Sequence, residues 1–86
     1  MDAQDSKTGG HTVTIKVNKQ PVRIKGPRAS GLEIKQAAIA AGVEIELDFV
    51  LSELHRDERP TIVGDRDMVE VTEHSAFSAV PDDDDS

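Results

Sequence analysis

Residues 11–26 read HTVTIKVNKQPVRIKG, and they contain the clearest structural signal in the chain. Three β-branched residues alternate with polar ones in the first half, at Val13, Ile15 and Val17. The segment VRIK repeats this alternation after NKQP (18–21), whose Asn and Pro are typical of turns. A period of two is the pattern of a half-buried strand. We therefore predict an N-terminal β-hairpin with one apolar face.

A helix is predicted directly after the hairpin, in ASGLEIKQAAIAAG (29–42). Ser30 and Glu33 have the spacing of a capping box, in which each side chain satisfies a free backbone N–H of the first turn. Alanine favours the helix interior, and Gly42 suits the left-handed position after the last turn. Residues at i, i+3, i+4 and i+7 form the face expected to press on a sheet. They are Ile34, Ala37, Ala38 and Ala41.

Later segments return to strand patterns. IELDFVLSEL (45–54) predicts a third strand whose inward residues are Leu47, Phe49 and Leu51. MVEV is either a fourth short strand or an extended connection, and SAFSAV (75–80) is the last strand, stopped by the following proline. This order predicts a two-layer α+β domain, with one helix packed on a mixed sheet of four to five strands.

Length and composition set the broad class. The 86 residues suit one domain, and without Cys there is no disulfide, thiolate nucleophile or Cys-based zinc site. The polar start of the chain lacks a signal-peptide pattern, and no segment approaches the roughly 18 apolar residues of a membrane span. We expect a cytoplasmic protein that does not bind membranes. Its expected parts are a disordered leader (1–10), a folded domain (11–81) and a flexible acidic tail (82–86).

Charge argues against nucleic acid as a partner. The net charge is −7, and the acidic run Asp82–Asp85 supplies four of these charges, which leaves −3 for residues 1–81. Nucleic-acid binding needs a basic footprint, and two Phe as the only aromatic residues provide no stacking platform.

The quoted hairpin, the capped helix and the late strands together are similar to the bacterial multi-ubiquitin domain family over roughly residues 11–81. The resemblance implies a ubiquitin-like β-grasp fold. It also implies partners: relatives of ubiquitin-activating and conjugating enzymes, often a peptidase, and target proteins. Ubiquitin-type modifiers end in Gly-Gly, but here the last glycine is Gly64. Activation would therefore use a different terminus, reached directly or after trimming of the tail.

Two groups of site residues follow from this resemblance. The conjugation or processing region is Val80, Pro81, Asp82, Asp83, Asp84, Asp85 and Ser86. The partner-binding surface, on outward strand positions, is Thr14, Lys16, Arg23 and Lys25, with Val50 and Ser78 as further candidates. The alternatives are a solubilising acidic tail and a merely solvated basic strip. The free edge of the hairpin also offers self-association by strand addition.

Catalysis, metals and cofactors are not expected. Glu70, Glu73 and His74 have no recognised ligand spacing, and His55 has no obvious metal-binding partner. His74 and Ser75 are sequence neighbours on a predicted strand, so their side chains would point to opposite faces.

Two functional hypotheses remain. In the first, the protein is a bacterial ubiquitin-like modifier joined to targets through its C-terminus. In the second, it is a non-covalent β-grasp interaction module that is never conjugated.

Overall fold

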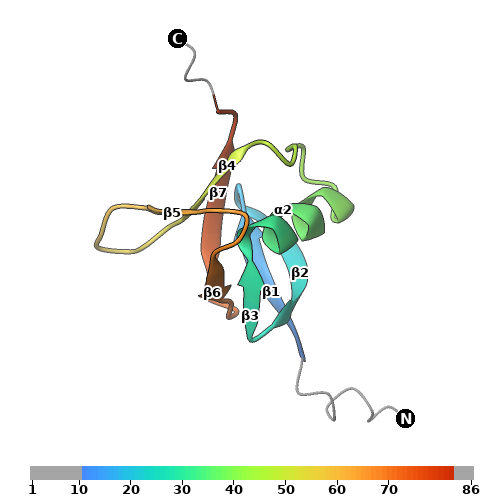
Figure 1. Cartoon of the computed structure of the whole chain (residues 1–86). Coiled ribbons are helices and arrows are strands. Elements are labelled where there is room, and N and C mark those ends of the chain that lie inside the picture. The colour runs from blue at the N-terminus through green and yellow to red at the C-terminus, as the bar shows by residue number, and fades with distance from the viewer. Residues whose placement is uncertain (1–10, 83–86) are drawn as a thin grey trace.

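The structure is a computed structural model that describes residues 11–82 (Figure 1). The predicted leader (1–10) lies outside the described residues, and so do residues 83–86 of the predicted acidic tail.

The N-terminal hairpin is confirmed, with a tighter turn than predicted. Strands β1 (His11–Val17) and β2 (Gln20–Gly26) pair antiparallel, with Ile15 opposite Val22. The turn consists of Asn18 and Lys19, both with positive φ, which lets the chain reverse within two residues. The predicted four-residue turn (18–21) was therefore too long, since its second half belongs to β2.

Helix α2 (Gly31–Ala40) begins at the predicted cap. The Ser30 hydroxyl accepts a hydrogen bond from the Glu33 N–H at 3.1 Å, and the Glu33 carboxylate accepts one from the Ser30 N–H at 2.9 Å. Ile34 and Ala38 are buried against the sheet as expected. Ala41 is exposed instead, because the helix ends at Ala40 and the next residue is its C-cap.

The main sheet contains three later strands, β4 (Val50–Glu53), β5 (Thr61–Val63) and β7 (Ala76–Val80). The strand order is β2-β1-β7-β4-β5, with β1 and β7 parallel and the other pairs antiparallel. Helix α2 packs on one face of this mixed five-stranded sheet (Figure 1). The α+β ubiquitin-like β-grasp fold is confirmed, with the first and last strands as central neighbours.

The structure also contains a second, two-stranded sheet, of which only one strand was predicted as a possibility. MVEV does form a strand, β6 (Met68–Glu70). Its partner is β3 (Arg28–Ser30), a short strand that immediately precedes the helix. The sequence pattern gave no sign of β3, because its three residues merge into the predicted start of the helix.

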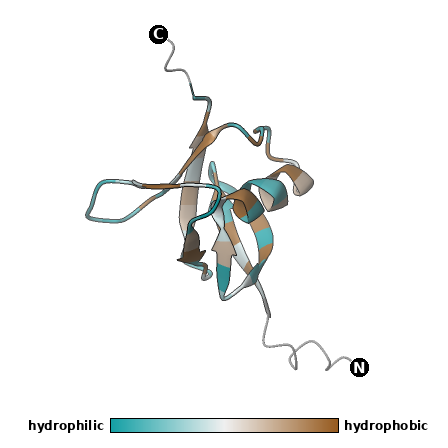
Figure 2. Ribbon diagram, viewed as in Figure 1, coloured by the Kyte–Doolittle hydropathy of each residue, from teal (hydrophilic) through white to brown (hydrophobic). Residues whose placement is uncertain are grey.

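The core lies between α2 and the sheet, and hydrophobic residues concentrate on these elements while the β4–β5 connection is largely hydrophilic (Figure 2). The third strand begins later than predicted, at Val50. Leu47 is 45% exposed, and Val43 and Ile45 are buried in its place. Before β4, the backbone carbonyls of Leu47 and Phe49 accept hydrogen bonds from the Lys35 ammonium.

Lys35 is the one charged residue buried among those the structure describes. Its Nζ donates to the carbonyl oxygens of Leu47 at 2.6 Å and Phe49 at 2.9 Å. It also lies 2.8 Å from a carboxylate oxygen of Asp65. One side chain of α2 thus connects the helix to two separate loops. The sequence alone does not predict these contacts, because Lys35 occupies an ordinary helix position.

Candidate functional site

The predicted basic strip is contiguous in the structure. Thr14, Lys16, Arg23 and Lys25 are all exposed, and they alternate with buried residues that face α2. Thr14 lies directly opposite Arg23 across the β1–β2 pair. The four side chains therefore share the outer sheet face, the face that α2 does not cover.

The other half of the outer sheet face carries apolar side chains and serine hydroxyls. Val50 lies opposite Val80, and Ser52 lies opposite both Ser78 and Ile62. Ile62 is 68% exposed and Val80 49%. We call these five residues the outer apolar patch. Ile62 and Val63 are adjacent apolar residues on β5, but only Val63 faces the core.

A hollow of about 350 Å³ lies between these two halves. It opens on the outer sheet face, because three of its lining residues occupy outward positions. These are Lys16 on β1, Leu54 just after β4 and Ala76 on β7. Its cationic side chains are Lys16 and Lys19, and Glu73 contributes a carboxylate. The full lining is Lys16, Lys19, Leu54, Glu73, His74, Ser75, Ala76 and Phe77.

The end of β7 is held by the hairpin turn. The Asn18 side chain accepts a hydrogen bond from the Ala79 N–H at 2.9 Å and donates one to the Ala79 carbonyl at 3.0 Å. The Asn18 N–H also donates to the Phe77 carbonyl at 3.0 Å. Beyond this clamp, Pro81 and Asp82 are exposed. The other predicted residues of the conjugation region, Asp83, Asp84, Asp85 and Ser86, lie outside the described residues.

Replacing Asn18 tests the clamp. In Asn18→Gly the positive φ is kept but both side-chain bonds to Ala79 are lost, so we expect a loss of about 2 kcal/mol in the free energy of unfolding. Urea unfolding measures this loss, and amide exchange at Ala79 should accelerate. The control Lys19→Gly relieves a positive φ without touching β7 and should leave exchange at Ala79 unchanged. Equal exchange in both variants would contradict the clamp.

The hairpin edge is poorly suited to strand addition. Strand β2 lies at one edge of the sheet, as that hypothesis requires. However, Pro21 has no N–H to offer, and Arg23 and Lys25 place positive charges along the edge. Natural proteins use these features to discourage edge pairing.

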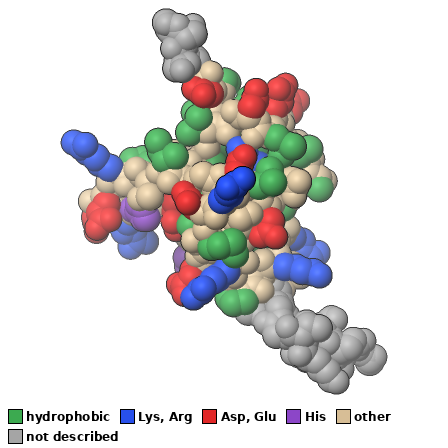
Figure 3. All heavy atoms as spheres, in the orientation of Figure 1, with side chains coloured by type: hydrophobic (Ala, Val, Ile, Leu, Met, Phe, Trp, Pro, Cys, Tyr) green, Lys and Arg blue, Asp and Glu red, His purple; other side chains and the backbone are tan. Residues whose placement is uncertain are grey.

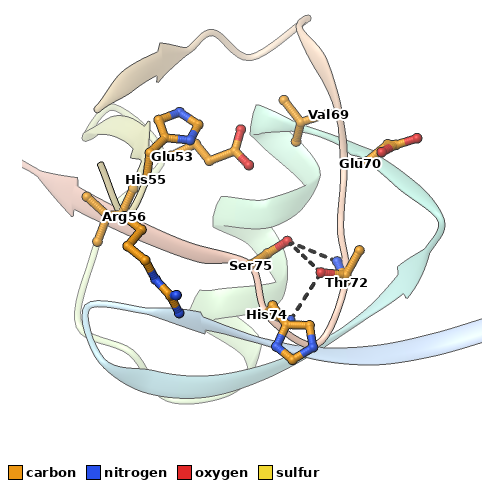
Figure 4. Close-up of a pocket in the computed structure, with 9 residues that line it drawn as sticks. Glu53, His55, Arg56, Val69, Glu70, Thr72, His74 and Ser75 are labelled. Atoms are coloured by element: carbon orange, nitrogen blue, oxygen red, sulfur yellow. Dashed lines mark hydrogen bonds between the residues drawn. The ribbon is translucent and has the colours of Figure 1, made fainter. Parts of the chain in front are cut away.

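A second hollow, of about 540 Å³, contains the histidines considered for metal binding (Figure 4). The His55 and His74 rings lie apart in it, on different segments (Figure 4). His55 Nε2 is 3.0 Å from the Thr61 hydroxyl, and the Ser75 hydroxyl accepts from the Thr72 N–H at 2.9 Å. Within residues 11–82, no three His, Asp or Glu side chains gather in a way that could hold a metal ion.

Charges of both signs are interspersed with hydrophobic side chains on the helix side of the molecule (Figure 3). The projecting connection between β4 and β5 also carries both signs (Figures 1 and 3). No helix in the described part of the chain has the length and apolar character needed to cross a membrane.

The fold of the described residues is consistent with a comparison of the sequence against protein families. The family model described as multiubiquitin matches residues 13–83. The chain belongs to the multiubiquitin family. The matched region of this multiubiquitin domain includes the basic strip, the outer apolar patch and the exposed end of β7. No curated protein and no solved structure matches the chain.

Proposed function

We propose that this multiubiquitin domain is a ubiquitin-like protein modifier of a bacterial conjugation pathway, acting in the cytoplasm. The observation that carries the proposal is the position of β7. This strand is central in the sheet and clamped by Asn18, and the residues that follow it, Pro81 and Asp82, are exposed. A rigid domain with an accessible segment after its last strand can present a carboxyl group to an activating enzyme, directly or after trimming.

In this proposal the modifier supplies a carboxyl group and a docking surface, and its partner enzymes supply the catalytic groups. The outer sheet face is the docking surface. Its basic strip attracts acidic surfaces of an activating or conjugating enzyme, and its outer apolar patch supplies the area that is removed from water on binding. A processing peptidase and the target proteins are the remaining partners.

The second candidate function is a non-covalent interaction module that uses the same face and is never conjugated. One specific observation favours it: no glycine follows Gly64 in the sequence. Side chains at Val80, Pro81 and Asp82 would have to enter an adenylation site that glycines enter without a clash.

Intact-mass analysis with peptide sequencing separates the two functions. The full chain is expressed together with any relatives of activating and conjugating enzymes that its neighbouring genes encode. We expect species that have lost residues after Val80, or whose end is joined to another protein by an amide bond. An activating enzyme without its adenylation activity is the control. If the chain stays unmodified beside enzymes shown to be active, the modifier proposal fails.

A charge-reversal pair tests the docking surface in the same cells. Arg23→Glu, in the centre of the basic strip, should reduce conjugate formation about tenfold, because like charges across an interface repel. Arg56→Glu makes the same change on the β4–β5 connection, outside the outer sheet face, and should have little effect. Quantitative mass spectrometry of conjugates measures both. Equal loss in the two variants would show that only net charge matters.

A further inference from the structure

The chain carries an acidic segment that complements its own basic hollow. Lys16 and Lys19 line the hollow over Ala76, and within residues 11–82 neither lysine has an ion-pair partner. Glu73 is the one carboxylate of the described residues in the lining. The acidic run Asp82–Asp85 places four carboxylates a short distance along the chain from this hollow.

Strand register shows that the run can reach the hollow. Lys16 pairs with Ala76 across the parallel strands, and Val80 lies four residues beyond Ala76. If the chain reverses at Pro81, the four residues of the run cover about 13 Å at roughly 3.3 Å per residue, which returns Asp85 to the level of Phe77, next to Ala76. Lys19 adjoins Asn18, which is bonded to Ala79, and therefore lies along the same path.

The same register places one basic residue out of reach. Lys25 pairs with Thr12, four residues further from the end of β7 than Lys16. It therefore lies about another 13 Å beyond the end of the returning segment. Lys16 and Lys25 belong to the same basic strip and are both exposed, so they form a matched pair for an experiment.

We propose that the acidic run docks in cis on the outer sheet face, with its carboxylates at Lys16 and Lys19 in the hollow over Ala76. Individual exposed ion pairs are weak, but attachment to the same chain gives the run a high effective concentration at the hollow. The docked run would cover the β7 side of the basic strip. A consequence that rests on the proposed function is that trimming the run uncovers the docking surface as it exposes the new end.

Lysine acylation measures this contact directly. The full chain and a variant carrying Asp82→Asn, Asp83→Asn, Asp84→Asn and Asp85→Asn are treated with a water-soluble N-hydroxysuccinimide acetate, and peptide mass spectrometry follows each lysine. We expect acylation of Lys16 and Lys19 to be about threefold faster in the variant, the size of effect that one exposed ion pair produces. Lys25 should react at the same rate in both proteins. In 0.5 M NaCl the difference at Lys16 and Lys19 should vanish.

Three results would overturn the proposal. They are unchanged rates at Lys16 and Lys19, an equal increase at Lys25, and an increase that disappears on hundredfold dilution, which would show contact between copies. Lys35 reports on folding, because its buried amine reacts only when the domain opens. The experiment uses no conjugating enzyme. Protection of Lys16 and Lys19 here, combined with an unmodified chain in the co-expression experiment, would therefore reject only the proposed function.

Discussion

Gly31→Ala should lower the free energy of unfolding by about 3 kcal/mol. A Cβ at this position would overlap the carbonyl oxygen of Gly64 and lie 2.9 Å from its carbonyl carbon. Both atoms are backbone, and they cannot move alone because the Gly31 and Leu32 N–H groups bond the Asp67 and Asp65 carbonyls at 3.1 and 3.2 Å. Helix propensity favours alanine by about 1 kcal/mol, so a net loss would come from the clash. A chain of this length has only about 4–13 kcal/mol of stability in total.

Gly64→Ala is the matched control on the other side of the same contact. Its Cβ would meet only the Asp67 carboxylate, at 3.2 Å, and this side chain can move. We expect a loss of less than about 1 kcal/mol, measured like that of Gly31→Ala by urea unfolding at a common m-value. A larger loss in Gly64→Ala than in Gly31→Ala would show that the close approach of the two backbones is not what limits stability.

Lys35→Met should cost about 2–3 kcal/mol of unfolding free energy. Methionine replaces the apolar stem but donates no hydrogen bond, so the Leu47 and Phe49 carbonyls lose their bonds to the ammonium. Leaving partly buried carbonyl acceptors without a donor costs more unfolding free energy than losing an exposed ion pair. Because the 41–49 loop is held to α2 through these bonds, amide exchange should also accelerate across that loop.

Asp65→Asn separates the ion pair from the carbonyl bonds. The Asp65 side chain is 52% exposed, so water screens its attraction to Lys35. We expect a loss of at most about 1 kcal/mol and no change in exchange across the 41–49 loop. If Asp65→Asn matches Lys35→Met, the ion pair, and not the two carbonyl bonds, stabilises this part of the fold.

Local signals in the sequence were sufficient for most of the fold. The alternation in 11–26 predicts both hairpin strands, and the capping box at Ser30 predicts the residue where the helix begins. These features depend on neighbours in sequence, which a single chain shows directly. The strand at 75–80 was predicted in the same way, whereas its central place depends on pairing with β1 and β4.

Contacts between distant segments could not be predicted. Lys35 occupies an ordinary helix position, and only the folded chain brings two loop carbonyls to its ammonium. Leu47, whose carbonyl accepts one of these bonds, is exposed although its alternation pattern predicted an inward side chain. Strand β3 was missed for a similar reason, since its three residues form a strand only because β6 pairs with them.

The candidate site was predicted where it depends on alternation alone. Thr14, Lys16, Arg23 and Lys25 occupy outward positions of one hairpin, and the structure places them together. The outer apolar patch needs the strand order, because its residues come from β4, β5 and β7. The Asn18 clamp joins residues 61 positions apart in sequence, and the sequence showed Asn18 only as a turn residue.

The central place of β7 also constrains when the protein can fold during its synthesis. Strands β1 and β4 do not pair with each other in the sheet; each pairs with β7, which is made after both. The sheet therefore cannot close until Val80 has left the ribosome. Until then, the hairpin and helix expose an apolar face that has nothing to cover it.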